Sequence, residues 1–167
     1  MFIPFDSMPP HSRLWIYQSN RTLTATDKEH LHQGLRDLCE QWSAHGTPLH
    51  TSFTLQFDLF VILVVDEHQQ GASGCSIDGS VRYLKSVQSQ LGLDFFDRTQ
   101  TAFLVNGKIT IYPIRELKTL FRNKTLSEDS ITFNNAVSTK AEWQNHWQIP
   151  SKDTWLARHL PKTAMAG

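Results

Sequence analysis

Apolar and polar residues follow two different periods along this chain, and each period predicts one type of secondary structure. Two segments carry an apolar residue at every third or fourth position, which is typical of amphipathic helices. Their apolar positions are Leu31, Leu35, Leu38, Cys39 and Trp42 in the first segment, and Ile77, Val81, Leu84, Val87 and Leu91 in the second. Thr26 and Glu29 match a capping box at the start of the first helix. Gly46 and Gly92 are expected to end the two helices.

Five other segments have the short apolar or alternating pattern of β-strands. They are Arg13–Ser19, Leu49–Phe57, Leu59–Val65, Thr101–Val105 and Lys108–Tyr112. The dipeptide Asn106-Gly107 predicts a two-residue hairpin between the last two strands. A tight link near Asp58 would pair the second and third strands in the same way.

The order of these elements predicts an α+β fold with a ferredoxin-like, split βαβ antiparallel sheet. Four or five strands would carry two helices on one face. We expect a single domain over residues 1–167, with the α/β core in residues 1–112 and a helical extension in residues 113–167 packed on it. The extension is expected to hold helices at 114–122, 139–147 and 151–160, and a loop or short strand at 132–135.

The length of 167 residues and the hydrophobic content of 40% fit a globular protein with its own core. Lys and Arg number 16, as do Asp and Glu, so the net charge gives no reason to expect nucleic acid or acidic lipid as a partner. Two cysteines do not make a disulfide framework. The longest apolar run, Leu59–Val65, is far shorter than the ~20 residues that span a bilayer. The first residues lack the pattern of a signal peptide. We therefore expect a cytoplasmic protein without membrane insertion.

The glycine-rich segment Gly71–Ser80 lies between the apolar strand and the second helix, and it is the most informative segment for function. The first backbone N–H groups of a helix are unpaired and carry partial positive charge, so they can hold an anion or lower the pKa of a thiol. The leading hypothesis is a small-ligand binding or regulatory protein with an anion site at Gly74–Asp78. The residues expected to bind the ligand are Gly74, Cys75, Ser76, Asp78, Asp97, Arg98 and Asn134.

A second hypothesis makes Cys75 the nucleophile of a thiol-dependent enzyme, with His45 or His68 as its base. Asp78 opposes this chemistry, because a nearby negative charge disfavours a thiolate. In a structural interpretation of the same loop, Cys75 is simply packed at the turn and Ser76 caps the helix.

The third hypothesis is a protein-interaction or homo-oligomerisation module that uses the edges or faces of its sheet. Asp97-Arg98 and Asn134-Asn135 also have structural interpretations, as a charge pair at a loop and as turn residues.

The eight histidines do not have the spacing of a metal site. His30 and His32 lie two residues apart, which places them on different faces of a helix. No Cys-x-x-Cys or His-Glu-x-x-His motif occurs. We expect no metal and no cofactor. Cys39 lies on the apolar face of the first helix and is expected to be a buried, unreactive thiol.

Seven short segments together resemble an uncharacterised bacterial protein family of about this length. They are Phe2–Asp6, Trp15–Gln18, Trp42 with His45-Gly46, Gly74–Asp78, Phe95–Arg98, Thr132–Asn135 and Trp155–Arg158. Members of that family sometimes carry the label "ABC transporter ATPase". The residues argue against nucleotide hydrolysis, because an ATPase of that type needs a Gly-x-x-x-x-Gly-Lys-Ser/Thr loop. Gly71–Ser80 has no such lysine, and Lys85 lies a turn or more into the helix.

Overall fold

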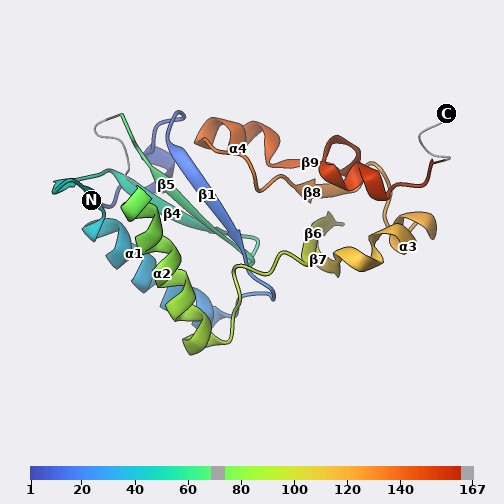
Figure 1. The fold of residues 1–167 in the computed structure, drawn as a ribbon, viewed down its shortest axis with the longest axis horizontal. Coiled ribbons are helices and arrows are strands. Elements are labelled where there is room, and N and C mark those ends of the chain that lie inside the picture. The colour runs from blue at the N-terminus through green and yellow to red at the C-terminus, as the bar shows by residue number, and fades with distance from the viewer. Residues whose placement is uncertain (69–73, 163–167) are drawn as a thin grey trace. The chain divides into compact units, whose positions relative to one another are not determined.

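The structure, a computed structural model, describes residues 1–68 and 74–162, leaving out the side chains of residues 74–76 (Figure 1). In these ranges the protein is α+β, with four α-helices and three antiparallel sheets. The chain divides into two compact units. Unit 1 is Met1–Asp97 with Asn135–Gln144, and unit 2 is Arg98–Asn134 with Asn145–Gly167. The expectation of a single domain stays a prediction.

The secondary-structure elements follow the predicted order through most of the chain. Those of unit 1 are η1 (Phe5–Ser7), β1 (Arg13–Gln18), α1 (Ala25–Gln41), β2 (Ser43–Ala44), β3 (Thr47–Pro48), β4 (Thr51–Gln56), β5 (Phe60–Val65) and α2 (Gly74–Leu91). Those of unit 2 are β6 (Gln100–Val105), β7 (Lys108–Pro113), η2 (Ile114–Glu116), α3 (Leu117–Arg122), β8 (Ile131–Phe133), β9 (Gln148–Pro150), η3 (Ser151–Asp153) and η4 (Trp155–His159). Helix α4 (Lys140–His146) begins in unit 1 and ends in unit 2.

Unit 1 is built on an antiparallel sheet in the order β1-β5-β4. The central strand β5 is buried along its whole length, as its unbroken apolar run predicts. Its neighbours place Trp15 and Phe53 opposite Leu63. Both long helices pack on one face of this sheet (Figure 1), where they share a single apolar cluster with alternate residues of β5. The cluster supplies most of the apolar burial that holds unit 1 together.

The start of α1 differs from the prediction. The capping box uses Thr24 and Asp27 rather than Thr26 and Glu29: the Thr24 hydroxyl accepts from the Asp27 N–H, and the Asp27 carboxylate accepts from the Thr24 N–H. Arg21 stabilises this capping box, because its guanidinium donates to the Asp27 carboxylate at 2.7 Å. The same guanidinium donates to the carbonyl of Leu91, at the end of α2, at 2.7 Å. One arginine therefore ties the start of α1 to the end of α2.

The two glycines expected to end the helices have different roles. Gly92 has φ of 66° and its N–H donates to the Gln88 carbonyl, which confirms it as the stop of α2. Gly46 does not cap α1, because that helix ends at Gln41 and its backbone then forms the short β2–β3 hairpin. With φ of 80°, Gly46 turns this hairpin instead.

Lys140 fixes the N-terminal arm of unit 1. Its side chain is 4% exposed, and its ammonium donates to the backbone carbonyls of Phe5, Asp6 and Met8 at 2.9, 3.2 and 2.7 Å. The same ammonium lies 5.2 Å from the Phe5 ring centroid, and that ring packs edge-on against Trp143. A buried cation is tolerated here because all three of its N–H donors have acceptors.

Unit 2 is built on a second antiparallel sheet, in the order β7-β6-β8-β9. The Asn106-Gly107 hairpin is confirmed: both residues have positive φ, and Val105 pairs with Lys108 across the turn. The buried residues of this unit form a smaller cluster, namely Phe103, Leu117, Phe121, Leu126, Leu156 and Leu160.

The strand order corrects two parts of the predicted fold. Split βαβ topology is not evident, because β6 pairs with β7 and β8 in a sheet of its own, and residue 139 forms the bridge beside β1 at Arg13. The C-terminal extension is also not purely helical: β8 at residues 131–133 overlaps the loop or short strand expected at 132–135, and β9 at 148–150 adds a strand that was not expected. Short strands that depend on long-range pairing leave little trace in local sequence.

Candidate functional site

The predicted anion site lies at the first turn of α2. The helix begins at Gly74, so Cys75 and Ser76 lie inside its first turn, and Ser76 is not the N-cap that the structural interpretation expected. The side chains of Gly74, Cys75 and Ser76 lie outside the described part of the structure, as do residues 69–73, including Gly71. Asp78 is described and is exposed.

Asp66 directly follows the central strand β5, and two histidines contact it. The Asp66 side chain is buried, and its Oδ1 lies 3.2 Å from Nε2 of His11. The same oxygen accepts the backbone N–H of His68 at 3.1 Å. The rings of His11 and His68 meet edge to face with centroids 3.9 Å apart. Residues from the N-terminal arm and from the end of β5 therefore meet at one place.

Burial opposes the ionisation of Asp66, but hydrogen bonds from His68 and His11 and the charges of these imidazoles outweigh it and lower the pKa of the carboxyl group. The lowered pKa keeps Asp66 ionised beside the two histidines. Its bond to the N–H two residues on is also an Asx turn, which explains how β5 ends here.

Sequence reasoning named His68 as a candidate base but missed Asp66 and His11. A carboxylate placed directly after a fully apolar strand was the available signal for Asp66. No local signal existed for His11, because it reaches Asp66 from 55 positions away in the sequence.

The other expected site residues are distributed over both units. His45 is exposed in the β2–β3 turn with φ of 51°. Asp97 is half-buried at the end of unit 1, and Arg98 is exposed at the start of unit 2. Asn134 is half-buried in unit 2 and donates its N–H to the Trp147 carbonyl at 2.7 Å. Their convergence with Gly74–Asp78 stays a prediction.

Cys39 agrees with its sequence interpretation. Its side chain has no exposed surface, and burial raises the pKa of its thiol to about 11. The hydroxyl of Thr51 donates to the Cys39 carbonyl at 2.8 Å, which ties the end of α1 to β4. A thiol in this state is protonated and unreactive.

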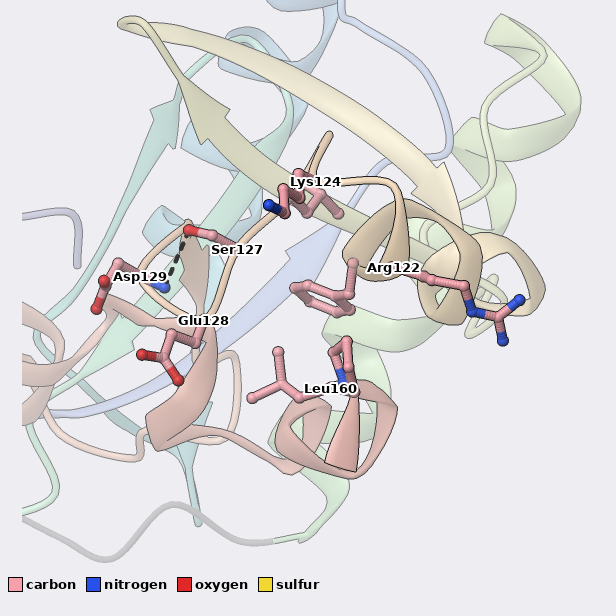
Figure 2. Close-up of a pocket in the computed structure, with 9 residues that line it drawn as sticks. Arg122, Lys124, Ser127, Glu128, Asp129 and Leu160 are labelled. Atoms are coloured by element: carbon pink, nitrogen blue, oxygen red, sulfur yellow. Dashed lines mark hydrogen bonds between the residues drawn. The ribbon is translucent and has the colours of Figure 1, made fainter. Parts of the chain in front are cut away.

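Unit 2 contains a hollow of about 610 Å³, shown in Figure 2. Buried apolar residues of its core form one side, and charged residues of the segment after α3 form another. The lining residues are Phe121, Arg122, Lys124, Leu126, Ser127, Glu128, Asp129, Leu160 and Pro161. A concave surface of this mixed kind suits a small organic molecule with polar groups.

Three comparisons with known proteins gave no match: no family model, no curated protein and no solved structure is similar to this chain. The family resemblance of the seven segments therefore stays a prediction. Within residues 1–68 and 77–162, no group of three or more His, Cys, Asp or Glu side chains could hold a metal ion. None of the helices described is long and apolar enough to cross a membrane.

Proposed function

We propose that this protein binds a small anion where β5 leads into α2, at Gly74–Asp78, and serves as a binding or regulatory protein. The observation that carries the proposal is the position of α2, an 18-residue helix whose first turn follows the end of the central strand. The first N–H groups of such a helix have no partners within it, and the helix dipole adds partial positive charge. A bound anion would accept hydrogen bonds from these N–H groups and would be attracted by the partial positive charge of the dipole.

His11 and His68 would supply further positive charge. The His11 ring and the His68 backbone N–H both contact Asp66 just after β5. Asp66 would hold the His11 ring in place, because its lowered pKa leaves it ionised. A protonated imidazole beside the site would attract an anion.

A phosphate titration followed by NMR tests this proposal. We expect the backbone amides of residues 74–79 to shift on adding inorganic phosphate. His11→Gln should weaken binding, whereas His30→Gln, an exposed position on α1, should leave it unchanged. Shifts confined to other parts of the chain would contradict the proposed site.

The arrangement around Asp66 also supports the thiol enzyme as a second candidate. A carboxylate that orients an imidazole is the usual companion of a base acting on a nucleophile. Asp66 contacts the His11 ring, which packs edge-on against the ring of His68, seven positions before Cys75 in the sequence. Iodoacetamide should then alkylate Cys75 rapidly, and His68→Ala should slow the reaction. Buried Cys39 serves as an internal control. Equal rates for the two thiols would exclude this candidate.

The sheet of unit 1 supports a distant relation to split βαβ folds. In the order β1-β5-β4, both neighbours run antiparallel to β5, and α1 connects the two outer strands. We infer that unit 1 keeps three of the four strands of that fold. Such sheets commonly present ligands at strand ends, which is where Asp66 lies.

A further inference from the structure

The net charge of zero conceals two oppositely charged units. Unit 1 contains seven Lys and Arg residues and twelve Asp and Glu residues, a formal charge of −5. Unit 2 contains nine Lys and Arg residues and four Asp and Glu residues, a formal charge of +5. The absence of net charge therefore does not argue against an anionic ligand of unit 2.

The basic residues of unit 2 gather around a second hollow of about 270 Å³. Lys118 and Arg122 reach it from α3, one turn apart, and Arg158 and Lys162 reach it from η4 and the segment that follows. His159, Leu160 and Pro161 complete its lining, which contains no carboxylate. We call this hollow the basic pocket. Lys118, Arg122 and Arg158 form no ion pair with any residue that the structure describes.

His159 lies among these cations with an unused hydrogen-bonding capacity. Both of its ring nitrogens are buried, and neither has a hydrogen-bond partner. Burial lowers the pKa of the imidazole, and the charges of Arg158 and Lys118 lower it further. Buried polar atoms are normally hydrogen-bonded, so an unsatisfied pair of nitrogens indicates a missing partner. An anion in the pocket would be that partner.

The basic pocket and the hollow of Figure 2 share a wall made of Arg122, Leu160 and Pro161. In Figure 2 the guanidinium of Arg122 points away from Glu128 and Asp129, so its charge does not face these carboxylates. A ligand could therefore place an anionic group in the basic pocket and an organic part against Leu160 and Pro161. The carboxylates of Glu128 and Asp129, which line the hollow of Figure 2, could accept hydrogen bonds from hydroxyl groups of the ligand.

We propose that unit 2 binds a phosphate monoester of a hydroxyl-bearing small molecule, with the phosphate in the basic pocket and the organic part in the hollow of Figure 2. A ligand with a single carboxylate would carry one negative charge, fewer than four cations can neutralise. A phosphate dianion carries two negative charges and offers several acceptor oxygens to the same side chains. The two arginines offer planar donor forks that suit phosphate oxygens. The pocket is too small for a polymer, which favours a terminal phosphate. This proposal does not depend on the site at Gly74–Asp78, since every residue that carries it lies in unit 2.

Calorimetric titration with ribose 5-phosphate, inorganic phosphate and ribose tests the proposal on the full chain. We expect ribose 5-phosphate to bind, inorganic phosphate to bind more weakly, and ribose not to bind. Lys118→Gln and Arg158→Gln should each weaken binding about tenfold, the effect of losing one charged hydrogen bond. Lys108→Gln, which removes the same charge from unit 2 outside both hollows, should change it less than about twofold, as expected of a screened surface charge.

Three outcomes would overturn the proposal. One is no binding of either phosphate, and another is an equal loss of affinity in the pocket and control variants. In the third, a single-stranded oligonucleotide binds more tightly than ribose 5-phosphate, and Lys108→Gln weakens that binding. This result would indicate an extended surface for polyanions. Failure in these experiments leaves the amide shifts expected at residues 74–79 unaffected, so the two proposals can be judged separately.

Discussion

Units 1 and 2 carry opposite formal charges and also use their charged side chains in different ways. In unit 1 five of the seven Lys and Arg residues have polar partners: Arg13 with Glu67, Arg21 with Asp27, Lys28 with Asp58, Arg36 with Glu40, and Lys140 with three backbone carbonyls. In unit 2, Lys152 pairs with Asp129. The cations that line the basic pocket form no ion pair with a described residue, although Arg158 donates to the Trp155 carbonyl and lies over the Trp155 ring. Gathering like charges without partners costs stability.

This difference separates two roles of charge. A paired or fully hydrogen-bonded charge contributes to the fold, so its removal should destabilise the protein. A charge held among like charges has no such contribution, and its placement is better explained by a ligand. Substitutions in the two units should therefore differ in their effect on the free energy of unfolding.

The largest effect is expected at Lys140. Lys140→Met keeps the length of the side chain but leaves three carbonyls without their donor, and we expect a loss of about 3 kcal/mol in the free energy of unfolding. Urea denaturation measures it. Lys85→Met, at an exposed position on α2, should change stability by less than about 0.5 kcal/mol. Similar values for both variants would remove the distinction between paired and unpaired cations.

The Arg21–Asp27 pair should have the next largest effect. Asp27→Asn weakens both the ion pair and the capping box, and we expect a loss of about 2 kcal/mol. The hydrogen bond from Arg21 lowers the pKa of Asp27 from 3.8 to about 2. A lowered folded-state pKa gives stability that is complete above about pH 4 and is lost as the pH falls towards 2.

The free energy of unfolding should therefore differ between Asp27→Asn and the natural protein near pH 6, and the difference should disappear as the pH falls towards about 2. Asp37→Asn, at an exposed position near the end of α1 where the carboxylate accepts a hydrogen bond from the Gln33 side chain, is the control and should show no such convergence. A stability difference that stays constant down to pH 2 would mean that the Asp27 carboxylate does not contribute through its charge.

The smallest effect is expected in the basic pocket, and its sign is opposite. Lys118→Gln removes one of several like charges, so stability should stay the same or rise by up to about 0.5 kcal/mol. The pKa of His159 should rise in this variant, because Lys118 is one of the causes that lower it. Chemical denaturation and an NMR titration of the imidazole provide the two readouts. A loss above about 1 kcal/mol would assign Lys118 to the fold.

Local patterns predicted the helices, the buried strand β5 and the Asn106-Gly107 hairpin because each depends on neighbours in sequence. The capping box was displaced by two residues because Arg21 supplies a partner that the Ser/Thr-x-x-Glu pattern does not include. Strand β9 and the pairing of β6 with β8 depend on long-range contacts, which short local segments do not encode; for β8 the sequence left a loop and a short strand open.

The candidate sites show the same limit. The helix N-terminus at Gly74 could be inferred from glycines after an apolar run, whereas the contact between His11 and Asp66 requires the folded chain. The basic pocket was hidden for a different reason. Its cations are spread from residue 118 to residue 162, and they are balanced in the total by the acidic residues of unit 1.

The pKa of His159 with and without ribose 5-phosphate tests the central claim, that the unpaired charges of unit 2 form a phosphate site. A bound phosphate would add negative charge and an acceptor beside the imidazole, both of which favour its protonated form. We therefore predict that the ligand raises this pKa from below its ordinary value, and that the rise disappears in Arg158→Gln. A His159 titration that is identical with and without the ligand at saturating concentration would contradict the account.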